Sequence, residues 1–139
     1  MFKTLWLFRR NPSLTRDEFI DYYETQHSKF VKDIPGVTKY FRRYPTQMAN
    51  LADAADQAPL DFDCIMELWF ESREASDAAL KHVADTIWPE VVEDEKRLFD
   101  RAGEGWCTTM IIQDEHETDM SSPGFESTYE RGLSAAIAE

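Results

Sequence analysis

Three segments of this 139-residue chain would bury apolar side chains on both faces of an extended strand, and this limits the folds open to it. They are residues 2–9, 61–70 and 104–113. In residues 61–70 one face would carry Phe62, Cys64, Met66, Leu68 and Phe70, and the other Asp63, Ile65, Glu67 and Trp69. A sheet with two apolar faces needs a covering layer on each of them.

Residues 37–47 are another strand candidate. Between them and the first strand, the sequence carries the clearest helix N-capping signals. Thr15 is a candidate N-cap, and Glu18, three residues later, completes a capping box. The helix should run to about Asp33, because Pro35 disfavours a helical residue before it. With the strands before and after it, this helix gives the first β-α-β half of the chain.

Two further helical stretches separate the third strand from the last one. Ser72 can cap a helix that runs to about residue 87, and Pro89 can start a shorter one that runs to about residue 101. The order is therefore β-α-β-β-α-β, which predicts an α+β fold: a ferredoxin-like half with an antiparallel four-stranded sheet and helices on one face. No helices remain for the other face, so we expect a second copy to cover it. The pair would be a two-fold homodimer that forms a dimeric α/β barrel.

Charge separates the chain into two parts. We expect residues 1–113 to form the domain and residues 114–139 to form an acidic C-terminal extension with seven acidic residues and one basic residue. Tyr129, Leu133 and Ile137 are spaced to give this extension an apolar helical face that could dock on the partner subunit, and disorder is the alternative.

Several functions are disfavoured by composition. The net charge of −12 opposes nucleic-acid binding, and no apolar run approaches a membrane span. The N-terminal residues do not resemble a secretory signal, so we expect a cytoplasmic protein. Cys64 and Cys107 lack metal-ligand spacing, and Glu24 with His27 makes only one Glu-x-x-His pair. We therefore expect no metal and no cofactor.

His27 is the leading candidate for chemistry. It shares one face of the predicted helix with Phe19 and Tyr23, at spacings of four residues, so it should point toward the sheet. An imidazole in an apolar pocket can act as a general acid or base near neutral pH. The alternative is a core histidine that bonds to a backbone carbonyl.

Other side chains are weaker candidates. Glu67 could orient His27 or exchange a proton with it, or it could pair with Arg42 or Arg43. Tyr23 could bind a substrate oxygen or be plain core. A pocket for an aromatic ring could be walled by three tryptophans, which could equally be core filler: Trp6, Trp69 and Trp88.

Two other polar features are most simply interpreted as structural. The acidic run 93–95 is most simply a solvated helix face, with a structural cap or a dimer contact as the alternative. His82, in the second predicted helix, is most simply a partly exposed side chain.

Residues 8–19 (FRRNPSLTRDEF), with Tyr22-Tyr23 and Gln26-His27, resemble the opening of EthD-domain proteins. Residues 62–70 and 93–100 resemble the third strand and the acidic helix end of the same family. The resemblance spans about residues 1–113. It implies the dimeric barrel, a catalytic role for His27, and cofactor-free chemistry on small aromatic or unsaturated rings. Where the family often has Ala-Pro-Leu after the histidine, this chain has Ser28-Lys29-Phe30, so the helix can continue past His27.

Together these features predict a cofactor-independent lyase or isomerase that acts on an aromatic, polyketide-like or lactone substrate by decarboxylation, dehydration or cyclisation. His27 would be its general acid/base. A cofactor-free monooxygenase and a non-catalytic binder of hydrophobic ligands are the alternatives.

Overall fold

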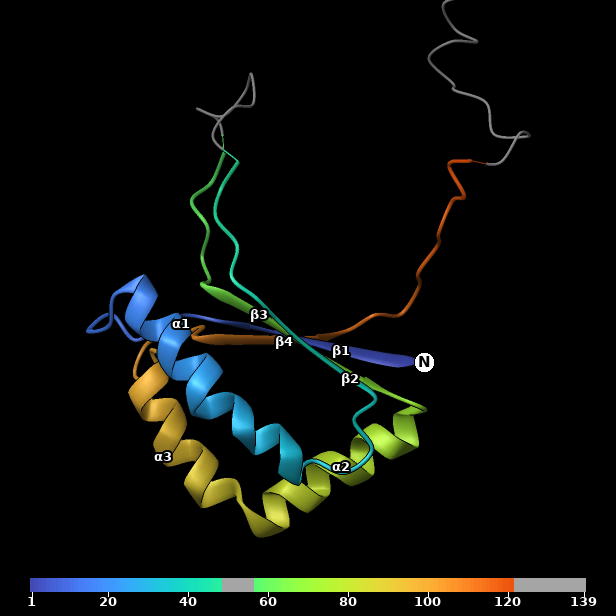
Figure 1. The fold of residues 1–139 in the computed structure, drawn as a ribbon, viewed down its shortest axis with the longest axis horizontal. Coiled ribbons are helices and arrows are strands. Elements are labelled where there is room, and N and C mark those ends of the chain that lie inside the picture. Colours follow the sequence, from blue (N-terminus) through green and yellow to red (C-terminus); the bar gives the residue numbers. More distant parts are fainter. Residues whose placement is uncertain (49–56, 122–139) are drawn as a thin grey trace, which may run out of the picture.

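The computed structural model describes residues 1–48 and 57–121, and these residues form an α+β domain (Figure 1). The docking helix expected in residues 125–138 lies outside them. The elements, in chain order, are β1 (Phe2–Phe8), α1 (Arg16–Thr25), the 3₁₀ helix η1 (His27–Asp33), β2 (Lys39–Arg43), β3 (Cys64–Phe70), α2 (Arg73–Thr86), α3 (Trp88–Leu98) and β4 (Cys107–Ile111).

The four strands form one antiparallel sheet in the order β2-β3-β1-β4. The two central strands are β1 and β3, with Thr4 opposite Leu68. All the helices lie on one side of the sheet (Figure 1). The predicted ferredoxin-like α+β topology is therefore confirmed.

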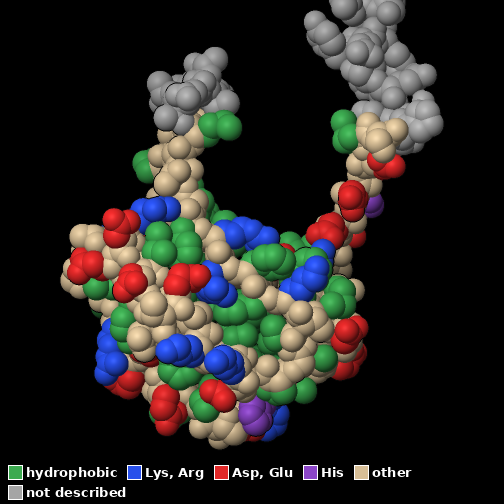
Figure 2. Space-filling view, in the orientation of Figure 1, with side chains coloured by type: hydrophobic (Ala, Val, Ile, Leu, Met, Phe, Trp, Pro, Cys, Tyr) green, Lys and Arg blue, Asp and Glu red, His purple; other side chains and the backbone are tan. Residues whose placement is uncertain are grey.

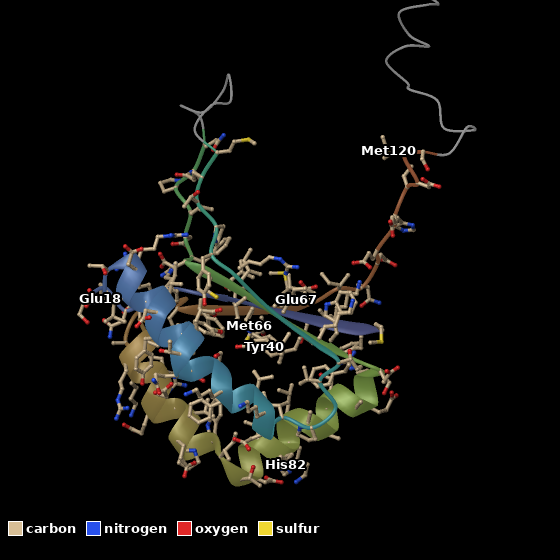
Figure 3. The ribbon with its side chains drawn as sticks, viewed as in Figure 1. Glu18, Tyr40, Met66, Glu67, His82 and Met120 are labelled. Atoms are coloured by element: carbon tan, nitrogen blue, oxygen red, sulfur yellow. The ribbon has the colours of Figure 1, made fainter. Side chains whose placement is uncertain are left out.

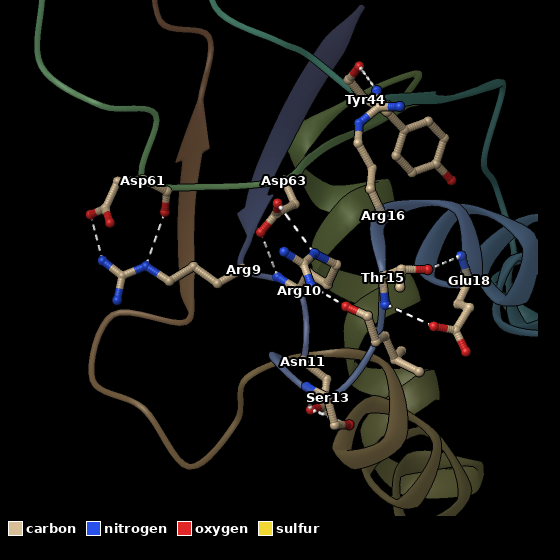
Figure 4. A network of polar contacts seen from close by, with 11 residues as sticks. Arg9, Arg10, Asn11, Ser13, Thr15, Arg16, Glu18, Tyr44, Asp61 and Asp63 are labelled. Atoms are coloured by element: carbon tan, nitrogen blue, oxygen red, sulfur yellow. Dashed lines mark hydrogen bonds and ion pairs between the residues drawn. The ribbon is translucent and has the colours of Figure 1, made fainter.

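The first helical region begins as the sequence predicts and ends differently. The Thr15 hydroxyl accepts from the Glu18 backbone N–H, and the Glu18 carboxylate accepts from the Thr15 N–H (Figure 4). The α-helix stops at Thr25, because Gln26 leaves helical geometry with φ −122° and ψ −65°. The tighter η1 then continues to Asp33. The chain thus stays helical to the expected end at Asp33, but it changes from an α-helix to a 3₁₀ helix just before His27.

The core lies between the sheet and the helices, in two connected clusters. One is centred on Phe8, Phe19 and Phe99, whose rings pack at centroid distances of 4.1–6.1 Å. The other is centred on Leu68 and Phe70 of β3, with α2 packed above them. Burial of these side chains provides the main stabilisation of the domain.

Two consecutive arginines fix the end of β1 (Figure 4). Arg9 donates from Nε to the Asp61 carbonyl oxygen at 2.9 Å and from Nη1 to the Glu104 carbonyl oxygen at 2.7 Å. The Arg10 backbone N–H donates to the Asp63 carboxylate at 2.8 Å. These contacts hold the entry to β3 and the entry to β4 beside the same strand end.

The opposite face of the sheet is not covered by any described element. Two arms, formed by residues 44–48 with 57–63 and by residues 112–121, run away from the sheet on this side (Figure 1). Between them, hydrophobic side chains and Lys or Arg side chains share the surface (Figure 2). We call this surface the bare face; its side chains include Lys3, Leu5, Leu7, Lys39, Phe41, Arg43, Ile65, Glu67 and Trp69.

Within the residues described, no helix combines the length and apolar character needed to cross a bilayer.

Candidate functional site

A cavity of about 260 Å³ opens between the helix-covered face of the sheet and the helices. Tyr40 and Met66 reach into this space from β2 and β3 (Figure 3). Its wall is mostly aromatic and aliphatic, and Trp6 and Trp88 belong to it as the sequence suggested. Trp106 also lines it; its place just before β4, beside the stacked Phe8 and Phe99 rings, was not inferred from the sequence.

His27 lines the cavity as the first residue of η1. It is buried, with 9% of its surface exposed, so the predicted inward direction is confirmed. Its ring meets the rings of Tyr23, Phe30 and Phe99 edge-on, at centroid distances of 5.2, 5.5 and 5.4 Å. These contacts restrict the rotation of the imidazole.

A carboxylate from α3 holds the other side of this ring. His27 Nδ1 lies 2.7 Å from Asp94 Oδ2, and the two side chains are equally buried. The second oxygen, Asp94 Oδ1, accepts from the Tyr22 hydroxyl and lies 3.9 Å from Arg97 Nη1. These contacts fix Asp94. His27 therefore bonds to a carboxylate, and not to a backbone carbonyl as the core alternative supposed.

The electrostatics of the pair favour one form of the imidazole. Burial lowers the pKa of His27 below its usual value, and the nearby Asp94 opposes this without cancelling it. A neutral ring that donates from Nδ1–H to Asp94 carries its lone pair on Nε2. Nε2 makes no hydrogen bond to any described residue. The geometry therefore presents a proton acceptor at the cavity.

The interpretation of residues 93–95 as a solvated face is wrong for two of them. Glu93 is exposed, but Asp94 and Glu95 are buried. The signal was present in the spacing of Val91, Asp94, Glu95 and Leu98, which together form the inward face of α3. Two adjacent acids on an inward face are costly unless they are paired or protonated, so this pattern marks a candidate site.

Glu67 and Trp69 lie on the bare face and do not meet His27. Figure 3 shows Glu67 on the opposite side of the sheet from Tyr40 and Met66. Its carboxylate accepts from Arg43 and, at 2.9 Å, from Trp69 Nε1–H. The pairing with Arg43 was the alternative left open by the sequence. The strand period of two explains the outcome, because residues 67 and 69 alternate with the cavity-facing residues 66 and 68.

Tyr23 is entirely buried beside the His27 ring but does not line the cavity. Its hydroxyl makes no hydrogen bond to a described residue, and burial raises the pKa of its phenol well above the usual value. Its position favours the core alternative.

His82 lies at the outer surface of α2, away from the sheet (Figure 3).

A second ionisable group, Glu95, lines the cavity from α3. Burial raises the pKa of its carboxyl, and Arg101 partly offsets this. The Cys107 thiol also lines the cavity, and burial raises its pKa to about 11.

Among the described residues, no group of three or more metal-ligating side chains converges. Glu24, the acid of the Glu-x-x-His pair, bonds instead to Arg42 Nη2 at 2.9 Å.

The sheet, its helices and a histidine–aspartate pair at an aromatic cavity define a ferredoxin-like α+β protein with an internal site. The EthD domain matches residues 11–102, which is most of the described core. The chain belongs to the EthD family. The search of curated proteins found no match.

Solved structures share the fold at low sequence identity. An ethyl tert-butyl ether d (ethd) family protein of Bacillus halodurans is 16% identical, with a TM-score of 0.55 over 83% of this chain and 99% of its own. A protein of Arabidopsis thaliana is 13% identical, with a TM-score of 0.55 over 85% and 99%. A monooxygenase of Streptomyces coelicolor, solved in complex with nanaomycin D, is 15% identical, with a TM-score of 0.53 over 86% and 92%.

Proposed function

We propose that this protein is a cofactor-independent enzyme of the lyase or isomerase type, which acts on a small aromatic, polyketide-like or lactone substrate. The observation that carries the proposal is His27 in an aromatic cavity: its Nδ1 is fixed by Asp94, and its Nε2 has no partner among the described residues. Asp94 takes the orienting role that the sequence offered to Glu67. Trp6, Trp88 and Trp106 serve as walls for a flat ring.

The chemistry follows from the protonation state of the ring. Neutral His27 accepts a proton at Nε2 from an acidic carbon or a hydroxyl of the substrate, and the Nδ1–H bond to Asp94 stabilises the imidazolium that forms. Returning the proton to another atom completes an isomerisation. Returning it to a leaving hydroxyl completes a dehydration. Each route uses the same histidine as base and then as acid.

The homodimer belongs to the same proposal. The bare face holds half-buried apolar side chains at the centre of the sheet, including Leu5, Leu7 and Ile65. A second sheet packed against this face would bury them and complete a barrel. The cavity lies on the other face, so each subunit would keep its own site.

A proton-exchange measurement tests the role of His27. The wild type should accelerate the exchange of the α-protons of 2-tetralone for deuterium, followed by NMR, because a cavity-bound ketone would meet Nε2. His27→Asn should lose at least about a hundredfold of this acceleration. The matched control is His82→Asn, which removes an exposed imidazole and should leave the rate unchanged. Equal rates for the two variants would contradict the proposal.

A monooxygenase is the second candidate, and the similarity to the Streptomyces coelicolor monooxygenase favours it. Such an enzyme would also use His27 as base, but on a phenol whose anion reacts with oxygen. Turnover that stops when oxygen is removed would select this candidate, and oxygen-independent turnover would select the lyase or isomerase. Tight binding without any product would instead indicate a ligand-binding accessory protein.

A further inference from the structure

Glu95 is a buried acid for which the proposed mechanism has no use. It is 7% exposed and comes from the same inward face of α3 as Asp94. Asp94 turns to His27 and Tyr22, whereas Glu95 turns to the cavity, near Arg101 and Cys107. A carboxylate in this position costs free energy unless a partner satisfies its oxygens.

The protein satisfies this carboxylate only in part. Arg101 Nε lies 3.2 Å from Glu95 Oε2, yet neither atom has a hydrogen-bond partner among the described residues. The guanidinium instead stacks on the Trp106 ring, with its central carbon 4.9 Å from the ring centroid. Arg101 therefore supplies charge beside Oε2, which has almost no accessible surface, while the other oxygen, Oε1, makes no hydrogen bond to a described residue.

Among the described residues no lysine or arginine lines the cavity, so a carboxylate or phosphate ligand would meet Glu95 with no cationic side chain on the cavity wall to bind it. A neutral ring with a hydroxyl donor would fit, because its O–H can donate to Oε1 of Glu95 while its ring contacts the tryptophans. The volume of about 260 Å³ lies below the usual range for drug-sized ligands, which favours a compact ring system.

We propose that Glu95 is a specificity-determining residue that accepts a hydrogen bond from a phenolic hydroxyl of the ligand. This inference rests on the proposed function, because it assumes that the aromatic cavity is the binding site. It adds a substrate class, a phenol, and a residue that selects it.

Binding of two matched probes tests the assignment. The probes 2-naphthol and 2-methoxynaphthalene share a ring system, but only the first can donate a hydrogen bond. By equilibrium dialysis at neutral pH, the wild type should prefer 2-naphthol by about tenfold to a hundredfold, the range for hydrogen bonds to charged groups. Glu95→Leu should reduce this preference by about tenfold or more. Glu93→Gln, at the exposed neighbouring position, should leave it unchanged.

His27 Nε2 is a second acceptor in the cavity, so the two must be separated. The preference should be measured in His27→Phe and in the double variant with Glu95→Leu. If Glu95 acts independently, its removal lowers the preference by the same factor in both backgrounds. An unchanged preference in Glu95→Leu would overturn the inference.

The pH dependence supplies a further check on the same probes. The ionisable groups near Glu95 are Arg101, Asp94 and Cys107, and His27 and Tyr40 line the same cavity. In His27→Phe, the preference for 2-naphthol should fall as the pH falls through the raised pKa of Glu95, because a protonated carboxyl is a weaker acceptor. Glu95→Gln should remove this dependence. A wild type that binds neither probe contradicts the cavity as a site, whereas equal binding of both contradicts only the role of Glu95.

Discussion

The two faces of the sheet carry similar residues in surroundings that differ in their exposure to solvent. Each has a carboxylate paired with a base: Asp94 with His27 against the covered face, and Glu67 with Arg43 on the bare face. In the first pair both side chains are 11% exposed, whereas Arg43 is 49% exposed. The same type of contact therefore lies in a low-dielectric site on one face and near water on the other.

Tryptophans show the same contrast. Trp6 faces the cavity, where apolar neighbours surround it. Trp69 lies between two ammonium groups, with Lys3 Nζ 4.0 Å and Lys39 Nζ 4.6 Å from its ring centroid. One face thus encloses an aromatic cavity, and the other presents a mixed apolar and basic surface. Neighbouring residues of β3 allow this difference to be tested within one strand.

The largest effect is expected from placing a lysine on each face of β3. Leu68 is 1% exposed, so Leu68→Lys buries an unpaired ammonium group and should cost about 3–5 kcal/mol in the free energy of unfolding. Ile65→Lys should leave the monomer folded and split the proposed dimer by opposing like charges. Circular dichroism during urea unfolding and analytical ultracentrifugation measure the two effects.

The control for that pair is Leu68→Met, which nearly conserves volume and should cost less than about 1.5 kcal/mol. A folded Leu68→Lys variant with wild-type stability would mean that the covered face is not the core. An Ile65→Lys variant with the same molecular mass as the wild type would remove the bare face from the interface.

The next largest effect is expected on the proton-exchange rate, when the carboxylate of each pair is replaced by its amide. Asp94→Asn keeps the size of the side chain but can leave His27 in the wrong tautomer, and it should lower the proton-exchange rate by at least about tenfold. Glu67→Gln changes the same atoms on the other face and should stay within about twofold of wild type. Similar losses in both variants would show that the faces are coupled.

The global arrangement was accessible from the sequence because its signals are local or periodic. The capping box placed the start of α1, and the alternation in residues 61–70 placed β3. Helical spacing also placed His27 on the inward side. These patterns depend only on neighbouring residues, so they survive without knowledge of the tertiary contacts.

The partners of His27 were not accessible in the same way. Asp94 is 67 residues away in the chain, and its contact depends on how α3 is packed against η1. Glu67 was offered as a partner because both faces of residues 61–70 carry apolar side chains, so the alternation did not show which face the helices cover. Trp106 was not singled out, although it lay within the predicted strand 104–113; β4 begins only at Cys107, and Trp106 stands just before it at the cavity wall.

A smaller effect concerns pH and stability. Burial lowers the pKa of His27 in the folded state, so the unfolded chain binds a proton at this residue more readily. The free energy of unfolding should therefore decrease as the pH falls from the ordinary histidine pKa through the lowered one, with a slope of at most about 1.4 kcal/mol per pH unit. Urea unfolding of wild type and His27→Asn at several pH values isolates this component, which the variant should lack.

NMR titration of the imidazole checks the cause of that shift. In Asp94→Asn the pKa of His27 should fall further, because the group that stabilises the imidazolium is gone. His82, exposed on α2, is the internal reference in the same spectra. A His27 pKa that rises in this variant would show that Asp94 does not stabilise the imidazolium.

The smallest effect is expected from the ion pair on the bare face, and it is also the most informative about assembly. In an isolated subunit Arg43→Gln should cost no more than about 1 kcal/mol, because the guanidinium is half exposed and screened by solvent. If two bare faces pack together, the same pair loses water, and removing Arg43 leaves Glu67 as a desolvated carboxylate with only Trp69 as donor. The loss in the free energy of unfolding should then grow with protein concentration, because the substitution destabilises the dimer and not the monomer. A cost that stays below about 1 kcal/mol at every concentration would place this pair, and the Trp69 ring beside it, outside the interface.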